Sequence, residues 1–359
     1  MAIETLTLYR FSLPLIRPYK LALGAVHALD TILCVAGDGS GREGFGEATI
    51  LTGYTTETIE ESWKIAVDLA ARVQGLEEAQ AKPVIEAEHK RAPFTCSALM
   101  TAVEMLQGHP LLEVMERTEV PLLAIINAME EDAIAAEIEA RLQEGYGTLK
   151  VKVGFDADAD AGRVRFIQDT VSGRALIRLD GNQGYCVEDA KKFAASLSPD
   201  GIELFEQPCP AGDWDAAVAV ADVASVPMML DESIYGPDDI ERAAELNAAD
   251  FIKLKLMKAG GLDALADGVA QIRDLGMTPV LGNGVASDPG CWMEACAARR
   301  LIDTAGEMNG FLKPETGIFA SPLAVSNGSV VLEAGTPVLK PAAELSALAS
   351  ATAEFTGRT

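Results

Sequence analysis

Three acidic residues, Asp180, Glu206 and Asp231, each follow a short apolar segment in the middle of the chain. If these segments are neighbouring strands of one parallel sheet, the three carboxylates converge at the same edge. Carboxylates held close together raise one another's pKa unless a cation lies between them. Oxygen ligands with no histidine or cysteine nearby suit Mg²⁺, with Mn²⁺ as a second option, rather than zinc. The pattern therefore predicts a divalent metal site made by these residues.

Lysines follow the apolar segments on either side of the acidic ones. Lys150 and Lys152 are two residues apart, and so are Lys253 and Lys255. Side chains two apart on a strand point to the same side, and burying them against helices is costly, so at least one pair is expected at the acidic edge. A lysine beside another ammonium group or a metal ion has a lowered pKa and can act as a base. These residues predict proton abstraction next to a metal-bound carboxylate, through an enediolate that the metal ion and the lysines stabilise.

Such residues need a scaffold that gathers strand ends. From about residue 120, a strand signal followed by a helical stretch repeats every 24 to 30 residues or so. The predicted strands are 121–127, 148–154, 176–182, 202–207, 227–232, 251–256, 278–283 and 308–313, and the predicted helices include 130–144, 187–197, 214–223, 237–246 and 262–275. Eight alternating strands predict an α/β fold of the TIM-barrel type, with catalytic residues at the carboxyl ends of the strands. A doubly wound open sheet is the competing arrangement.

The first part of the chain has a different pattern. Strand signals at 3–14, 30–35 and 44–48 and helical stretches at 57–73 and 97–106 predict an α+β domain over residues 1–115. The barrel is then expected over residues 116–328. The tail, residues 329–359, is expected to contain a further strand and to return to the first domain.

Composition narrows the classes of function. The chain has 359 residues and a net charge of -25, which argues against nucleic acid or an anionic membrane as a partner. No apolar run approaches the roughly 20 residues that span a bilayer, and the first residues lack a signal-peptide pattern, so a cytoplasmic location is expected. The six cysteines form no CxxC pair, and the three histidines all precede residue 110. Reduced thiols are therefore expected, and His-dependent triads and zinc motifs are not expected in the barrel.

Five segments together resemble the enolase superfamily, and within it the muconate-lactonizing-enzyme subgroup. They are TLKVKVG (148–154), LDGNQG (179–184), FEQP (205–208), LDES (230–233) and IKLKLMKAGG (252–261). The resemblance covers nearly the whole chain. It implies a (β/α)7β barrel behind an N-terminal α+β capping domain, and Mg²⁺-dependent chemistry with lysine bases. The lack of barrel histidines separates the chain from the mandelate-racemase subgroup.

The resemblance also implies a role for individual residues. They are the metal ligands Asp180, Glu206 and Asp231, the acid/base pair Lys152 and Lys255, an assisting Lys150 that contacts the substrate carboxylate, and the supporting residues Asn182 and Glu232. Tyr54 in a loop of the first domain, Asn283 after the seventh predicted strand and Lys313 at the end of the eighth are further candidates for substrate contact.

Two loops of the first domain, residues 15–28 and 50–55, are implied to close over the barrel mouth, with Tyr54 as the first specificity residue to test. Dipeptide epimerases of the subgroup resemble one another in an Asp-x-Asp pair at the last strand, which holds the substrate ammonium. This sequence has Lys313 and Glu315 there instead, which argues against a dipeptide. Lys313 either binds a second anionic group or is solvated.

Proton abstraction leaves several reactions open. Two opposed bases suit racemisation or epimerisation of an amino-acid-derived carboxylate, which is the favoured hypothesis. One base suffices for dehydration of a hydroxy amino, imino or hydroxy acid, or for a muconate-type cycloisomerisation. An aldolase that forms a Schiff base would need one desolvated lysine and no metal ligands, and a metal-stabilised binding barrel would have no use for both lysine pairs. The partner is a small carboxylate in each enzymatic case, and the residues are compatible with a homo-oligomer without specifying one.

Overall fold

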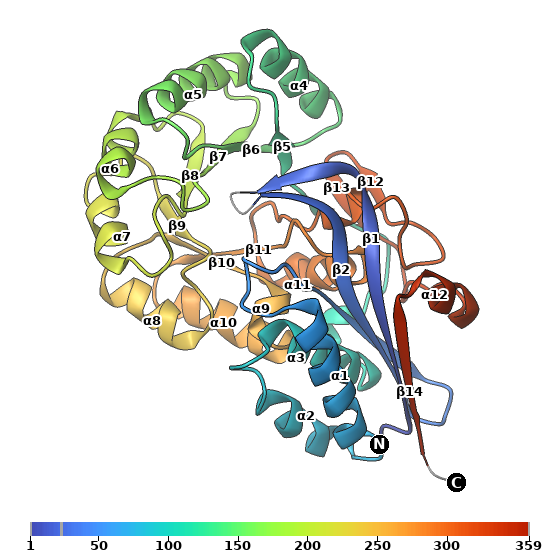
Figure 1. Ribbon diagram of the computed structural model, residues 1–359. Helices are drawn as coiled ribbons and strands as arrows, with labels where there is room; N and C mark the ends of the chain where they lie inside the picture. Colours follow the sequence, from blue (N-terminus) through green and yellow to red (C-terminus); the bar gives the residue numbers. More distant parts are fainter. Residues whose placement is uncertain (1, 22–23, 358–359) are drawn as a thin grey trace.

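The chain folds into two parts that lie side by side (Figure 1). The computed structural model describes residues 2–21 and 24–357. One part is an antiparallel sheet with helices against it, and the other is a curved parallel sheet with helices around its outside. Within the described ranges, no helix is long and apolar enough to cross a membrane.

The first part is built on a four-stranded antiparallel sheet in the order β14-β1-β2-β3. Its strands are β1 (Thr5–Leu21), β2 (Gly24–Gly37), β3 (Glu43–Thr49) and β14 (Ala351–Thr356). Apolar side chains of β1 serve both faces: Leu6 and Leu8 pack in one core, and Phe11 and Leu13 pack in the core that extends into the barrel. The sheet is therefore held between its own helices and the second part.

Three helices cover the outer face of this sheet: α1 (Ile59–Val73), α2 (Glu78–Glu86) and α3 (Pro93–Leu106). The sequence predicted α1 and α3 but not α2. The fit of α3 against β3 depends on glycine, because a Cβ at Gly46 would lie 2.1 Å from the carbonyl oxygen of Ala98. Any larger residue at this position would push the helix away from the sheet.

The sequence predicted a loop at residues 15–28. This prediction is wrong, because β1 and β2 continue through most of that segment as a hairpin. Residues 22 and 23 lie outside the described residues. The amide of Ile16 donates to the carbonyl of Lys313 at 2.9 Å, and the amide of Glu315 donates to that of Pro14 at 2.8 Å. The hairpin thereby reaches over the mouth of the second part, as Figure 1 shows.

The second part is a seven-stranded parallel sheet in the order β11-β10-β9-β8-β7-β6-β5. Its strands are β5 (Ala124–Ile126), β6 (Thr148–Lys152), β7 (Leu176–Asp180), β8 (Ile202–Glu206), β9 (Met228–Leu230), β10 (Phe251–Leu254) and β11 (Thr278–Leu281). From β6 onward, each strand begins within one residue of its predicted start and ends one or two residues earlier. The helices that follow are α4 (Glu131–Gln143), α5 (Ala157–Val171), α6 (Val187–Ser196), α7 (Trp214–Ala221), α8 (Pro237–Glu245), α9 (Leu256–Ala259), α10 (Leu262–Asp274) and α11 (Asp288–Leu301).

The predicted eighth strand, 308–313, is wrong. Gly306 instead forms an isolated parallel bridge with Leu122, and the amide of Glu307 donates to the carbonyl of Leu281 at 3.1 Å. This short segment joins the β11 side of the sheet to the β5 side and closes the barrel, which excludes the open-sheet alternative. The chain then turns into the 3₁₀ helix η2 (Gly310–Leu312), and a Cβ on Gly310 would lie 2.2 Å from the carbonyl oxygen of Ala286.

Shorter elements complete the structure at the base of the barrel and in the tail. They are η1 (Pro110–Leu112), the three-stranded sheet of β12 (Ala324–Ser326), β13 (Ser329–Leu332) and β4 (Thr118–Pro121), and α12 (Ala342–Leu348). In the tail, β13 pairs with β4, whereas β14 pairs with β1 of the first sheet.

Buried carboxylates fasten the first part to the barrel helices. Glu104 on α3 accepts hydrogen bonds from the amides of Leu262 (2.6 Å) and Asp263 (3.1 Å) at the start of α10. Glu47 on β3 accepts from the amides of Gly290 (2.7 Å) and Ser287 (3.3 Å) at the start of α11. The first amides of a helix have no partner within the helix and attract negative charge. These contacts hold the loop after β3, which carries Tyr54, over the strand ends.

Candidate active site

The three predicted carboxylates come together at the carboxyl ends of neighbouring strands. Asp180 ends β7 and Glu206 ends β8, and the sheet register places the two side by side. Asp231 follows β9 directly, and all three side chains are buried. Because β7, β8 and β9 are adjacent in the sheet, the three carboxylates lie side by side. Asp180, Glu206 and Asp231 are called the acidic floor below.

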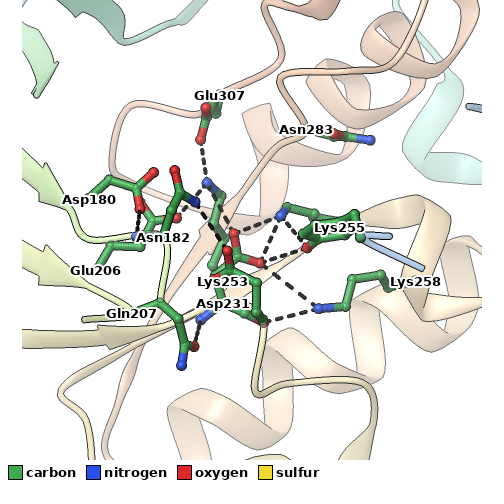
Figure 2. A network of polar contacts seen from close by, with 12 residues as sticks. Asp180, Asn182, Glu206, Gln207, Asp231, Lys253, Lys255, Lys258, Asn283 and Glu307 are labelled. Carbon is green, nitrogen blue, oxygen red and sulfur yellow. Dashed lines mark hydrogen bonds and ion pairs between the residues drawn. The ribbon is translucent and has the colours of Figure 1, made fainter. Parts of the chain in front are cut away.

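Two buried ammonium groups, those of Lys150 and Lys253, lie among these carboxylates. Figure 2 shows Lys253. The Nζ atom of Lys150 is 2.8 Å from Asp180 Oδ2, 2.9 Å from Glu206 Oε2 and 2.9 Å from Glu307 Oε2. The Nζ atom of Lys253 is 3.1 Å from Glu206 Oε1 and also donates to Glu307 Oε2. The two lysines therefore share two carboxylates. Each contacts a different oxygen of Glu206, and both contact the same oxygen of Glu307.

Lys152, the last residue of β6, forms one flank of the floor. Its Nζ atom lies 2.6 Å from Asp180 Oδ2 and donates to Asn182 Oδ1. The Nδ2 atom of Asn182 in turn donates to Glu232 Oε1 at 3.1 Å. The Lys152 side chain is 24% exposed, so this flank is accessible from outside.

Lys255 forms the other flank, beyond β10. Its Nζ atom is 2.6 and 2.8 Å from the two oxygens of Asp231 and 2.5 Å from the hydroxyl of Tyr54. The same hydroxyl is 3.1 Å from Asp231 Oδ1, and the Tyr54 ring lies 4.4 Å from the Lys255 ammonium. Lys258 donates to the carbonyl of Asp231 at 3.0 Å and lies over the ring of Tyr235 at 4.2 Å. With its side chain 8% exposed, Lys255 is enclosed.

The charges of the site decide the protonation of its members. Burial disfavours the charge of Asp180, but Lys150 and Lys152 outweigh it and lower the pKa of this carboxyl to about 2. Burial and the nearby Asp180 charge raise the pKa of Glu206. Burial likewise disfavours the charge of Lys255, but Asp231 raises the pKa of its ammonium above the ordinary value. Asp231 therefore favours the protonated, ammonium form of Lys255.

The donor set fits a hard divalent cation, because it offers carboxylate oxygens alone. Glu206 Oε2 is buried and has no hydrogen-bond partner among the described residues, although Lys150 Nζ is 2.9 Å away. Within the same residues, no three Asp, Glu, His or Cys side chains already form a group that could hold a metal ion. The ammonium groups of Lys150 and Lys253 lie between these carboxylates instead.

Two cavities lead to the site. The inner one, of about 60 Å³, is lined by both flanking lysines, by Asp180 and Asp231 of the acidic floor, and by Asn283. The outer one, of about 810 Å³, is lined by Lys152 together with Arg17 and Lys313 and several apolar side chains. Four exposed apolar residues belong to its wall: Ile16, Met129, Phe155 and Leu312. Lys152 thus stands where the two cavities meet.

The remaining predicted residues lie at different distances from the floor. Tyr54, Asn182 and Glu232 belong to it through the hydrogen bonds described above. The amide of Asn283 contacts the sulfur of Met257, and Figure 2 shows it set apart from the acidic cluster. Lys313 donates to the carbonyl of Gly284 and borders the outer cavity rather than the floor.

Sequence reasoning assigned no role to Glu307 or Lys253. Glu307 lies just before the misplaced eighth strand, so its position at the barrel mouth was not recognised. Lys253 was recognised only as the neighbour of Lys255, although a spacing of two residues in extended chain places both side chains on the same side. A lysine buried on the inner face of a barrel strand needs a carboxylate beside it, so Lys253 could have indicated an acidic residue such as Glu307 at the barrel mouth.

Fold and site together define a class of enzyme. Its members have a parallel barrel with carboxylates from three adjacent strands, lysines on both sides of them, and a separate sheet that covers the mouth. Comparison with known proteins agrees with this description. The sequence profile of the family described as "Enolase C-terminal domain-like" matches residues 133–337. The chain belongs to the enolase superfamily.

Individual relatives are spread over more than one reaction. The chain is 29% identical to the L-Ala-D/L-Glu epimerase of Bacillus subtilis over 92% of its own length and 94% of that protein. It is 28% identical to muconate cycloisomerase 1 of Rhodococcus opacus, over 93% and 94% of the two chains. A dipeptide epimerase from Cytophaga hutchinsonii, solved with Mg and D-Ala-L-Val, superposes with a TM-score of 0.88 at 22% identity, covering 99% of this chain and 100% of that one. This last likeness shows the shared fold.

Proposed function

We propose that this protein is a Mg²⁺-dependent isomerase that removes the proton next to a substrate carboxylate and returns it to either face, racemising or epimerising an amino-acid-derived acid. The observation that carries the proposal is the placement of two lysines. Lys152 on β6 and Lys255 after β10 both line the inner cavity, and the three acidic strands lie between them. A carbon held in that cavity can be reached by one amine on each face, which is what 1,1-proton transfer requires.

The chain's own residues divide the work. Asp180, Glu206 and Asp231 would hold the metal ion, which, when bound, polarises the substrate carboxylate and stabilises the enediolate. Lys255 would deliver a proton on the enclosed side, where Tyr54 keeps water away. Lys152 would take the proton on the open side, and the roles reverse for the opposite enantiomer.

The relatives support the choice of metal and reaction. The Cytophaga epimerase was solved with Mg, and the Bacillus relative is an epimerase of an amino-acid-derived acid. Mn²⁺ remains an alternative metal within this proposal, and a cytoplasmic location is part of it. The outer cavity would receive the substituent of the substrate.

Isotope exchange tests the proposal directly. Purified enzyme with Mg²⁺ is incubated in D₂O with each enantiomer of a library of N-acyl amino acids and dipeptides, and deuterium at the α carbon is followed by NMR. We expect racemisation with deuterium incorporation for at least one class. Lys152→Ala and Lys255→Ala should each abolish racemisation, and each should retain exchange from one enantiomer only.

A surface variant provides the matched control. Lys192 is 57% exposed and pairs with the exposed Asp158, so Lys192→Ala should leave exchange unchanged. Exchange from both enantiomers in both active-site variants would refute the two-base assignment.

The unequal exposure of the two lysines also fits a reaction that needs only one base. A single base at the open flank, with a fixed proton donor at the enclosed one, also suits dehydration of a hydroxy amino, imino or hydroxy acid, or a muconate-type cycloisomerisation. The Rhodococcus relative is a cycloisomerase. Loss of water from the substrate, measured by mass spectrometry, would identify dehydration, whereas an isomeric lactone or diacid of equal mass would identify cycloisomerisation.

A further inference from the structure

Lys253 is a buried cation for which the proposed proton transfer has no use. Its side chain is 3% exposed, and it projects from β10 into the centre of the acidic floor (Figure 2). The Nζ atom lies 3.1 Å from Glu206 Oε1 and 3.7 Å from Asp231 Oδ2, so it touches two of the three proposed metal ligands. It also donates to Glu307 Oε2, a carboxylate outside the proposed ligand set.

The contacts form a closed ring of alternating charge. Glu206 gives one oxygen to Lys253 and the other to Lys150, and both lysines meet again on a single oxygen of Glu307. A buried carboxylate without a cation beside it is strongly destabilised. The ring holds two charges of each sign, so its ammonium groups balance Glu206 and Glu307 before any divalent ion arrives.

The same ring opposes the arrival of an ion. An ammonium group 3 to 4 Å from the ligand oxygens repels a divalent cation at those oxygens, and in a buried site this repulsion is weakly screened. Glu307 offers Lys253 a partner that the ion does not need. The ammonium can thus stay on Glu307 while Glu206 and Asp231 turn to the ion.

We infer that Lys253 is an internal counter-ion of the metal site, and that it weakens Mg²⁺ binding by competing for Glu206 and Asp231. Glu307 is the positioning residue that retains Lys253 when the metal ion is bound. This inference rests on the proposed metal site. It predicts a site that is preformed without metal and exchanges its ion readily.

Isothermal titration of the full-length protein with MgCl2 alone tests the inference. Lys253→Met removes the charge and keeps most of the volume, so we expect the Kd for Mg²⁺ to fall about tenfold or more. Glu307→Gln leaves Lys253 with only the metal ligands as partners, so its Kd should rise about tenfold. In the double variant there is no Lys253 for Glu307 to retain, so its Kd should stay close to that of Lys253→Met, and Lys253→Arg should not tighten binding.

Other outcomes would overturn the inference. Circular dichroism and thermal unfolding first establish that each variant is folded. If folded Lys253→Met binds Mg²⁺ as wild type does or more weakly, Lys253 does not compete with the ion. Should that variant fail to fold, Glu307→Gln decides alone, and unchanged or tighter Mg²⁺ binding rejects the idea.

The two proposals can fail separately. Wild-type racemisation with no change of Mg²⁺ affinity in Lys253→Met would end this inference and leave the proposed function intact. Tighter Mg²⁺ binding in that variant, with no isotope exchange on any substrate by wild type, would do the reverse.

Discussion

The two lysine flanks of the site are built in opposite ways. Lys152 has a partly exposed side chain and stands between the inner and the outer cavity. Lys255 is enclosed by a tyrosine that both hydrogen-bonds to it and covers it with its ring. One flank is thus an entrance and the other a closed end.

This difference indicates how a substrate would enter. Its reacting carbon would pass Lys152 and stop against Lys255, leaving any substituent in the outer cavity. Exclusion of water strengthens charge interactions at the closed end, so the proton donor there needs a fixed position. The open end needs space for the substituent instead. Four predictions test this comparison, from the largest expected effect to the smallest.

Removing either lysine should cost the most. Lys152→Ala and Lys255→Ala should each lower kcat by about 10³-fold or more, in line with the loss of a general base or acid. Added ethylamine should partly restore Lys152→Ala, because that flank is open, and should fail to restore Lys255→Ala. Equal rescue of both variants in steady-state assays would remove the distinction between the flanks.

Tyr54→Phe should have the next largest effect. It deletes the hydroxyl shared by Lys255 and Asp231 but keeps the ring over the ammonium. Loss of one hydrogen bond to a charged group costs about 1.5–3 kcal/mol, so we expect kcat to fall on the order of 10- to 100-fold. The loss should be larger for the enantiomer that is deprotonated by Lys255. A uniform rise in KM alone would place Tyr54 in substrate binding only.

The outer cavity should affect KM rather than kcat. Lys313 and Arg17 give it positive charge, and Glu137 in its wall accepts hydrogen bonds from two backbone amides. Lys313→Met should raise KM for an N-succinyl amino acid about tenfold, the cost of one charged contact, and leave the N-acetyl analogue unchanged. Equal effects on both substrates would mean that Lys313 has no role in binding a second anionic group.

The smallest effect on turnover is expected from the docking that keeps the closed end closed, where the change is in folding stability. Burial raises the pKa of Glu47 to about 7, against 4.5 ordinarily. An acid whose pKa is raised on folding contributes its stability below the unfolded value and loses it as pH rises through the folded value. From pH 4.5 to 7, unfolding free energy should therefore fall in wild type by up to about 3 kcal/mol relative to Glu47→Gln. Urea unfolding of both proteins at pH 5 and pH 7 measures this, and parallel pH profiles would contradict it.

Much of the site followed from strand periodicity. Asp180, Glu206 and Asp231 could be grouped because each ends a strand in a regular repeat, and parallel strands share one carboxyl edge. The lysine pairs followed from the two-residue alternation of a strand. These signals are local, and the barrel converts them into neighbours in a fixed order.

The parts that escaped prediction depend on tertiary contacts. The barrel closes through Gly306 and Glu307, a segment too short to leave an apolar run in the sequence. The placement of Tyr54 over Lys255 depends on the docking of two sheets, which no local pattern encodes. The ring around Lys253 likewise becomes visible only when Glu307 is placed in space.

The pairing of β14 with β1 joins residues that are almost a whole chain apart, such as Thr5 and Thr356. During synthesis from the amino end, the outer edge of β1 stays unpaired until β14 has left the ribosome. Open strand edges invite pairing with other chains. Nascent molecules of this protein should therefore be prone to mistaken association until β14 has emerged and paired with β1.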